Sequence, residues 1–337
     1  MRLDWKGVLG LTISAALLTW TLRHESPAAI WAVLRASNLW LMVGGALIAT
    51  LVFPLRALRW QVILEPIARL PFGPLWRSVA VGMMVNNVVP ARAGELARAY
   101  AITRETPQVG FAAAFASLAV DRLMDAVVVV CLLVASVSLS GISPDTTISG
   151  VTTVRSLTIV SGLIAVGALA FVTLMAFAPA LVERMADRVL AAVAPRFRVR
   201  LLALLRGLLS GLGALRSPSR FARILAWATV MWLVNALSFW ISFRSVGIDV
   251  PYSAALFVQG IIAIGVAFPS SPGFFGVFEF AGVNGLALYN VPASLAVSWA
   301  LGFHILSFLP ITFIGLYYFG RMGLHFRDIG KAKASAT

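Results

Sequence analysis

Charged side chains inside apolar segments are the residues of this sequence whose types and spacing could do chemistry. The clearest group, Asp121-Arg122-x-x-Asp125, lies in the apolar run 110–139. At 1.5 Å per helical residue, Asp121 lies roughly 16 Å along a helix that begins at Gly110. An ionisable group at a bilayer centre costs about 2.5–3.5 kcal/mol, so it faces the interior of a helix bundle. There Asp121 and Asp125, on one helix face, either steady arginines or carry a proton, and Arg122 can pair with Asp125. A buried structural network is the alternative.

A second group of polar residues interrupts a short apolar segment. It reads Asn86-Asn87-x-x-Pro90-x-Arg92-x-Gly94-Glu95-x-x-Arg98. Proline and glycine predict a break in the helix here, and unwound backbone leaves amide groups free. A guanidinium such as that of Arg92 beside free amides is a good phosphate receptor. Glu95 and Arg98 are three residues apart and can form an ion pair; a pair that merely closes the hairpin is the alternative interpretation.

Two further groups carry isolated charges. Arg56-x-x-Arg59-Trp60 lies at the end of an apolar run. Its arginines either join a binding site or extend to lipid headgroups, with the tryptophan as an interface anchor. Glu279 follows Gly273 in a phenylalanine-rich stretch and has no charged neighbour in sequence. We therefore expect Glu279 either to pair with an arginine of the first half of the chain or to be protonated. The candidate arginines, in order of expectation, are Arg92, Arg98 and Arg59.

Composition decides which class of element positions these residues. Of the 337 residues, 60% are apolar and 12% are charged, against about half and a quarter in soluble domains. This excludes a soluble domain and predicts an all-α polytopic integral membrane protein. The net charge of +14 indicates contact with the anionic cytoplasmic leaflet and not with nucleic acid. The three histidines have no metal-ligand spacing, and no P-loop or glycine-rich dinucleotide turn occurs, so we predict no metal and no cofactor.

Six apolar runs approach the roughly 20 residues needed to cross the hydrocarbon core. They are 7–22, 38–55, 110–139, 156–178, 224–246 and 293–319. The first has the layout of a signal peptide but no clean cleavage site, so we interpret it as a retained membrane helix. Two broken segments, 78–104 and 253–289, contain short apolar runs interrupted by proline and glycine, which is typical of re-entrant hairpins. We predict one membrane domain, 1–337, with six full spans and two re-entrant broken hairpins; eight full spans are the alternative.

Loop charge orients these spans. With both termini in the cytoplasm, 22 of the 27 basic residues fall on the inner side, as the positive-inside rule requires. The four on the outer side are Arg23, Arg35, Arg155 and Arg244. Segment 179–223 is basic and leucine-rich, and we expect it to lie as a helix in the inner interface. The two hairpins then enter from opposite sides, as in a transporter built from inverted repeats, whose substrate site lies where broken helices meet.

The four groups, in this order, resemble the flippase-like membrane domain of lysylphosphatidylglycerol synthetases. The last group there reads Pro272-Gly273-x-x-Gly276-x-x-Glu279, and the resemblance covers about residues 40–320. Asp121-Arg122 stands where the family usually has Glu-Arg, and Phe274 stands where a second glycine is more usual. The synthetases carry a soluble catalytic domain after the membrane part, whereas this sequence ends at Thr337. The resemblance therefore implies the translocating part alone, without aminoacyl transfer.

The leading hypothesis is a lipid flippase of the bacterial cytoplasmic membrane, and not an enzyme. It would move an anionic phospholipid or a polyprenyl-phosphate lipid between leaflets, with membrane lipids and a separate lipid-modifying enzyme as partners. One alternative is a membrane enzyme that acts on a lipid-linked substrate through carboxyl groups such as Asp121 or Glu279. Another is an accessory subunit of lipid or glycolipid synthesis that docks through 179–223. The expected substrate-binding residues are Arg56, Arg59, Asn87, Arg92, Glu95, Arg98, Asp121, Arg122, Asp125, Gly273 and Glu279.

Overall fold

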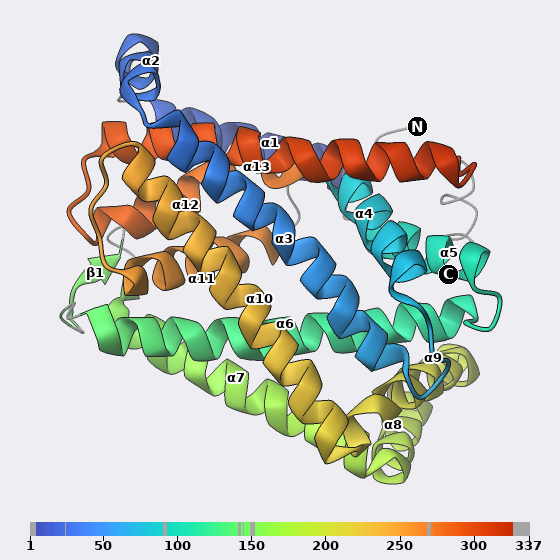
Figure 1. Cartoon of the computed structure of the whole chain (residues 1–337). Coiled ribbons are helices and arrows are strands. Elements are labelled where there is room, and N and C mark those ends of the chain that lie inside the picture. Colours follow the sequence, from blue (N-terminus) through green and yellow to red (C-terminus); the bar gives the residue numbers. More distant parts are fainter. Residues whose placement is uncertain are drawn as a thin grey trace.

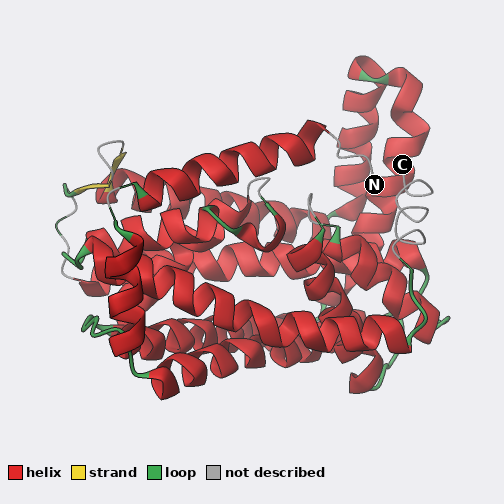
Figure 2. Cartoon of the chain, turned by 90° about the horizontal axis from the view of Figure 1, so that it is seen from above, coloured by secondary structure: helices red, strands yellow, loops and turns green. Residues whose placement is uncertain are grey.

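The fold is all-α, as predicted (Figures 1 and 2). The computed structural model describes residues 5–23, 25–89, 93–140, 143, 145–148, 152–267 and 271–325. Its helices are α1 (Trp5–Leu22), α2 (Pro27–Ala36), α3 (Leu39–Leu64), α4 (Phe72–Val88), α5 (Gly94–Glu105), α6 (Phe111–Ser140), α7 (Val154–Phe177), α8 (Pro179–Val193), α9 (Arg198–Gly211), α10 (Pro218–Ser245), α11 (Tyr252–Ala267), α12 (Val277–Ala287) and α13 (Ala293–Arg321). Short 3₁₀ segments are η1 (Pro195–Phe197), η2 (Leu212–Arg216) and η3 (Pro272–Phe274). A two-residue antiparallel ladder joins β1 (Thr147–Ile148) and β2 (Thr152–Thr153) between α6 and α7.

Five of the described helices are long and apolar enough to cross a membrane. They are α3, α6, α7, α10 and α13, and each coincides with a predicted span. The sixth predicted span corresponds to α1, whose apolar part, Leu9–Leu22, is shorter. Helix α2 was not predicted: its ten residues lie in the segment we took for a loop, where Ser26 caps the amide of Ala29 and Pro27 occupies the first helical position.

Both predicted helix breaks are confirmed. Helix α4 ends at Val88 and α5 begins at Gly94, and α11 ends at Ala267 before η3 and α12. Helix α12 has 11 residues, about 16 Å at 1.5 Å per residue, against a hydrocarbon core of about 30 Å. This length disfavours the eight-span alternative. The side from which each hairpin enters the membrane stays a prediction.

The packing of the helices is symmetric between two halves of the chain. Helices α3 and α10 lie antiparallel and side by side (Figure 1). The amide N–H of Asn38 donates to the carbonyl of Ser245 at one end (2.8 Å), and Arg223 pairs with Glu65 at the other (2.6 Å). In the first half, α4 packs on α3, α5 and α13, and α5 packs on α6. In the second half, α11 correspondingly packs on α10, α12 and α6, and α12 packs on α13. Exchanging α3–α6 for α10–α13 therefore leaves the pattern of contacts unchanged, as inverted repeats require.

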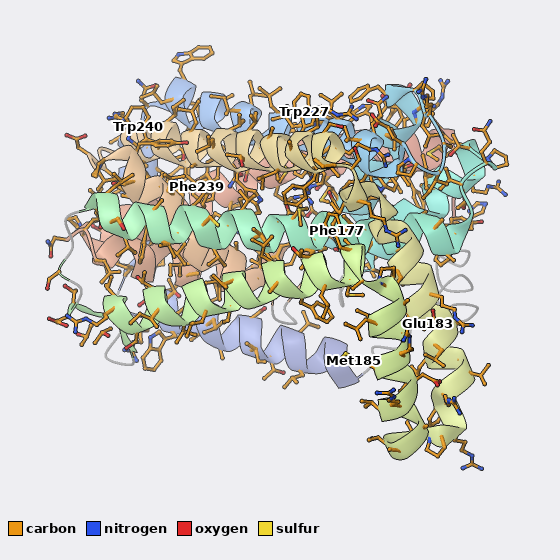
Figure 3. All side chains as sticks on the ribbon, turned by 90° about the horizontal axis from the view of Figure 1, so that it is seen from below. Phe177, Glu183, Met185, Trp227, Phe239 and Trp240 are labelled. Carbon is orange, nitrogen blue, oxygen red and sulfur yellow. The ribbon has the colours of Figure 1, made fainter. Side chains whose placement is uncertain are left out.

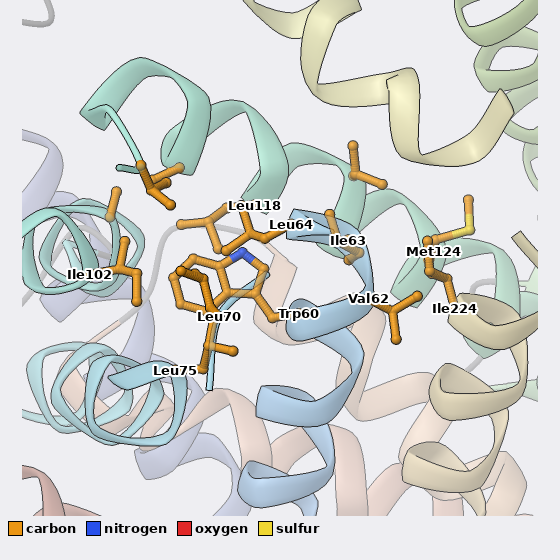
Figure 4. Close-up of a cluster of buried hydrophobic side chains, with 14 of the residues drawn as sticks. Trp60, Val62, Ile63, Leu64, Leu70, Leu75, Ile102, Leu118, Met124 and Ile224 are labelled. Carbon is orange, nitrogen blue, oxygen red and sulfur yellow. The ribbon is translucent and has the colours of Figure 1, made fainter. Parts of the chain in front are cut away.

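Two apolar clusters hold the halves in place. One surrounds the fully buried Trp60 and joins α3 to α4, α5 and α6 (Figure 4). The other packs Phe239 edge-to-face against Trp299 and Phe303, with ring centroids 5.5 and 5.2 Å apart, and joins α10 to α13. In lipid the hydrophobic effect does not drive helices together, so close packing of this kind holds them. The charged residues described below lie on the helices that these clusters fix.

Segment 179–223 is a helical hairpin and not the single helix that we predicted. Helices α8 and α9 pack together and project from the bundle (Figure 3, where Glu183 and Met185 mark α8). Arg198 donates to Asp187 (2.7 Å), and its hydrogen bond lowers the pKa of that carboxyl. Residues 218–223 already belong to α10. A break at Pro195, which cannot continue a helix, separates the two arms.

Candidate functional site

Helices α3 and α6 meet through a buried cluster of charges. Arg56 and Arg59 lie one turn apart on α3, and Asp121 and Asp125 lie one turn apart on α6. Arg59 donates through Nε to Asp121 Oδ1 (2.8 Å) and through Nη1 to Asp125 Oδ1 (2.6 Å). Arg56 donates through Nη1 to Asp125 Oδ2 (2.9 Å) and reaches Asp121 Oδ2 at 3.3 Å. The planar guanidinium fork allows Arg59 to bind both carboxylates through different nitrogens, whereas Arg56 reaches both through Nη1.

Burial decides between the two interpretations of these arginines. The exposed fraction of Arg59 is 0% and that of Arg56 is 7%, so neither side chain extends to lipid headgroups. The snorkelling interpretation is therefore wrong for both. These two arginines and the buried Arg98 therefore no longer count among the basic residues of the inner loops. The remaining basic residues are still in excess on the predicted inner side.

Helices α5 and α10 join the same cluster. Arg98 of α5 donates through Nη1 to Asp121 Oδ2 (2.8 Å), and its guanidinium lies 4.0 Å above the Trp60 ring. Trp232 of α10 donates through Nε1 to Asp125 Oδ1 (3.0 Å). The prediction that Asp121 steadies an arginine of the broken hairpin is confirmed. Four helices are thus held together by two carboxylates.

Glu95 and Arg98 do not pair with each other, and that prediction is wrong. Glu95 binds Arg122 of α6, and Arg98 binds Asp121 of the same helix. Both side chains of α5 face α6, so each finds an opposite charge there in place of its neighbour three residues away. The predicted contact between Arg122 and Asp125 is present, at 4.0 Å.

The first helix break is closed by an asparagine and two glycines. The amide N–H of Gly94 donates to Asn86 Oδ1 (2.8 Å). A Cβ atom on Gly94 would overlap the carbonyl of Gly82 and the Asn86 side chain, so this close approach of α4 and α5 requires glycine. Asn87 donates through Nδ2 to Thr312 Oγ1 of α13 (2.7 Å) and links the break to the other half. Arg92, our first candidate for a phosphate receptor, lies outside the described residues.

A cavity of about 270 Å³ lies between the halves. Its polar lining residues are Arg56, Asn86, Asn87 and Arg122 from the first half, and Trp232, Asn235, Gln259, His304 and Ser307 from the second. Phenylalanine, methionine and aliphatic side chains make up most of the rest. Of the predicted site residues, Arg56, Asn87, Arg122 and Gly273 therefore line this cavity. Arg59, Arg98, Asp121 and Asp125 belong to the ion cluster that holds Arg56, and Glu95 holds Arg122.

Glu279 is fully buried, and its charged or titratable partner among the described residues is a histidine. Glu279 Oε1 lies 2.7 Å from His304 Nδ1, and Oε2 accepts the amide N–H of Gly276 (2.6 Å). His304 Nε2 lies 2.9 Å from the carbonyl oxygen of Gly273. The prediction of an arginine partner is wrong for Arg98 and Arg59, which bind Asp121 of α6, because α12 packs against α13 of its own half. Arg92, the first candidate, lies outside the described residues. We had considered the histidines only as metal ligands, although a single histidine inside a membrane span is itself a sign of function.

Comparison with known proteins agrees with this arrangement. The family described as the lysylphosphatidylglycerol synthase TM region matches residues 7–315. The chain belongs to this family. It is also similar to glycosyltransferase AglD of Haloferax volcanii, with 31% identity over 119 residues, which are 35% of this chain and 19% of AglD. That match thus spans about a fifth of AglD.

The range that matches the lysylphosphatidylglycerol synthase TM region contains the whole ion cluster and the cavity. In the cluster, four arginines (Arg56, Arg59, Arg98 and Arg122) face three carboxylates (Glu95, Asp121 and Asp125). Among the described residues, one positive charge therefore has no counter-charge. Two buried donors, Arg56 Nε and Gln259 Nε2, have no hydrogen-bond partner among these residues, and both side chains line the cavity. Such a site can hold an anionic group with further polar atoms.

Sequence reasoning also missed Trp232, Asn235 and Gln259. Asn235 donates through Nδ2 to Gln259 Oε1 (3.1 Å) on the cavity wall. Each is a single neutral polar or aromatic residue within an apolar run. The two amides carry a weak signal, because amide side chains in membrane helices prefer the bundle interior; tryptophan carries none.

Proposed function

We propose that this chain is a lipid translocator that moves an anionic headgroup through the cavity between its halves. The observation that carries the proposal is the uncompensated positive charge beside that cavity. A buried cation without a counter-charge costs several kcal/mol, and a bound phosphate removes this cost. The path suits a lipid, because the headgroup enters a polar cavity while the acyl chains stay in the bilayer.

The two helix breaks supply the moving parts of this proposal. Asn87, in the last turn of α4 before the first break, and Gly273 of the second break line the cavity, so both breaks adjoin the proposed headgroup site. In transporters with inverted repeats, one repeat rocks against the other around such a site. We propose the cytoplasmic membrane of a bacterium as the location, with both termini inside, on the charge distribution given above.

Arg56→Lys is the sharpest test. Lysine keeps the positive charge beside Asp125 but removes the guanidinium and its unused Nε–H. The matched control is Arg244→Lys, because Arg244 lies at the end of α10 and pairs only loosely with Asp249 (3.9 Å). A hydrogen bond to a charged group contributes about 1.5–3 kcal/mol, so we expect Arg56→Lys to slow translocation by roughly ten- to a hundredfold. Arg244→Lys should match the wild type.

The assay uses phosphatidylcholine vesicles with a trace of acyl-labelled phosphatidylglycerol. Dithionite outside the vesicles bleaches the label in the outer leaflet, and further bleaching reports translocation. Labelled phosphatidylcholine, which is zwitterionic, should move more slowly. Equal rates for vesicles with and without the protein would overturn the proposal.

A second candidate is a membrane component of glycolipid synthesis. It is favoured by the similarity to AglD, whose name describes a glycosyltransferase. The same vesicles separate the two functions, because a synthesis component would change the chemical identity of a lipid-linked sugar acceptor or require a partner enzyme. Mass spectra of the lipids after the assay, with a sugar nucleotide added, provide that readout.

A further inference from the structure

The contact between His304 and Glu279 fixes the number of protons that this pair must hold. The carbonyl oxygen of Gly273 can only accept a hydrogen bond, so His304 Nε2, at 2.9 Å, carries a proton. At 2.7 Å, the contact of Nδ1 with Glu279 Oε1 needs a second proton between the two atoms. The pair therefore holds two protons, as imidazolium with carboxylate or as imidazole with carboxylic acid. In both forms it is electrically neutral.

Loss of one proton breaks one of these two contacts. A neutral imidazole beside an ionised Glu279 has a single N–H, so a lone pair must face either the carboxylate or the Gly273 carbonyl. Such a contact is repulsive, and the pair then carries a charge of −1. Gly273 and Phe274 lie in the second helix break, in the left-handed region with φ of 66° and 64°. Protonation of His304 thus decides whether α13 holds this break.

We propose that His304 and Glu279 form a proton-binding site that couples proton movement to movement of the anionic lipid; this inference rests on the proposed function. One proton binds to the pair from one side of the membrane and leaves on the other. No covalent bond other than N–H or O–H forms or breaks. The coupling has two physical causes. One is the change in the charge of the pair beside the cavity, and the other is the change in the contact between α13 and the second helix break.

The change in charge affects anion binding because His304 lies in the wall of the cavity. His304 lines it together with Arg56 and Arg122, beside the cluster with one uncompensated positive charge. When the pair holds both protons it is neutral, and the uncompensated positive charge of the cluster attracts a phosphate. When the pair has lost a proton, its charge of −1 cancels this positive charge, and affinity for an anion falls. Each anionic headgroup is therefore bound together with one proton, because the two affinities are linked.

The other groups around His304 are aromatic rings, neutral polar side chains and arginines. Phe275 stacks on the ring and Phe278 packs against it at a tilt, with centroids 4.4 and 4.2 Å away. On the side of α1, Ser14 binds the amide of Ser271, and α10 and α11 contribute the neutral Asn235 and Gln259 to the cavity. Across the cavity, α3 and α6 contribute Arg56 and Arg122, and an arginine does not lose its proton. Helix α4 contributes the neutral Asn86 and Asn87 to the same cavity, and Ser307 of α13 donates to the carbonyl oxygen of His304 (3.2 Å).

The other half of the molecule carries a fixed charge at the equivalent place. Arg122 and His304 each lie eleven residues after the first residue of their helices, α6 and α13. Each binds a glutamate at the start of the preceding short helix, Glu95 of α5 and Glu279 of α12. The symmetric packing of the halves thus relates an arginine, which keeps its proton, to a histidine, whose side chain can gain or lose one. At this pair of equivalent places, the residue that can exchange a proton belongs to the second half.

The test measures labelled phosphatidylglycerol and protons in the same vesicles, with a trapped pH dye. In the wild type we expect lipid flux to change up to tenfold per unit of imposed pH gradient and to carry protons with it. Glu279→Gln is the informative variant. A glutamine accepts the Gly276 N–H and donates to His304 Nδ1, so the contacts persist with neutral imidazole and no dissociable proton on residue 279. Its lipid flux should lose the dependence on the gradient.

His325→Gln is the matched control, because His325 is exposed beyond the end of α13, and it should retain the wild-type dependence. Lipid flux in the wild type that ignores the pH gradient and moves no protons overturns the inference while the proposed function stands. The same holds if folded Glu279→Gln keeps the wild-type response to the gradient. Should Glu279→Gln fail to fold, the proton flux of the wild type alone decides. An absence of lipid flux at every pH overturns the proposed function, and this inference with it.

Discussion

Asp121→Asn tests whether the buried ion cluster holds the bundle together. The carboxylate of Asp121 accepts hydrogen bonds from Arg59 and Arg98, each at 2.8 Å, and lies 3.3 Å from Arg56. Asparagine keeps one acceptor oxygen but turns an NH₂ group towards these cations. Three buried arginines then share the single charge of Asp125. Removal of one member of a buried ion pair costs about 3–5 kcal/mol, and we expect a loss of this size.

The second half of the experiment is a double-mutant cycle. Arg98→Met alone leaves Asp121 with two arginines, so it should cost less than Asp121→Asn. In the Asp121→Asn background, the same change removes a buried cation that has lost its carboxylate, and stability should recover. We expect a coupling free energy of about 0.5–3 kcal/mol, as for contacting residues of one network.

The assay is the free energy of unfolding in mild detergent, from titration with a denaturing detergent followed by circular dichroism. Asp145→Asn is the control, because Asp145 pairs with Arg155 on the surface (3.2 Å), and it should stay within about 0.5 kcal/mol of the wild type. An Asp121→Asn protein as stable as Asp145→Asn would refute the reasoning. So would additive effects of Asp121→Asn and Arg98→Met.

Three further outcomes are expected. In the same unfolding titration, Gly94→Ala should lose about 1–3 kcal/mol, because its Cβ overlaps the neighbouring helix. Gly44→Ala, with nothing within 4 Å of the new Cβ, should be neutral or gain up to about 1 kcal/mol; equal losses would show that helix approach is not the cause. Trp232→Phe removes the hydrogen bond to Asp125 (3.0 Å) and should lose about 1.5–3 kcal/mol. A reporter fused after Thr337 should be active only in the cytoplasm, and periplasmic activity would reverse the proposed topology.

Local physical rules account for what the sequence alone could predict. The length of the apolar runs placed α3, α6, α7, α10 and α13, because a span needs enough apolar residues to cross the lipid. Proline and glycine placed both helix breaks, because they interrupt the backbone hydrogen bonds of a helix wherever it packs. The cost of charge in lipid marked Asp121 and Asp125 as interior residues, and both are buried.

Only the tertiary structure decided which charge meets which. Spacing along α5 suggested a pair between Glu95 and Arg98, yet both bind residues of α6. Glu279 likewise binds His304, 25 residues away, a partner that no spacing within one helix indicates. The spacing of residues along a sequence describes the surface of one helix. The ion-pair partner of a residue depends also on which surface of a neighbouring helix faces it and on how far the two helices are shifted along their axes. Side-chain packing across the whole bundle sets the rotation and the axial shift of each helix, and a local sequence pattern does not predict them.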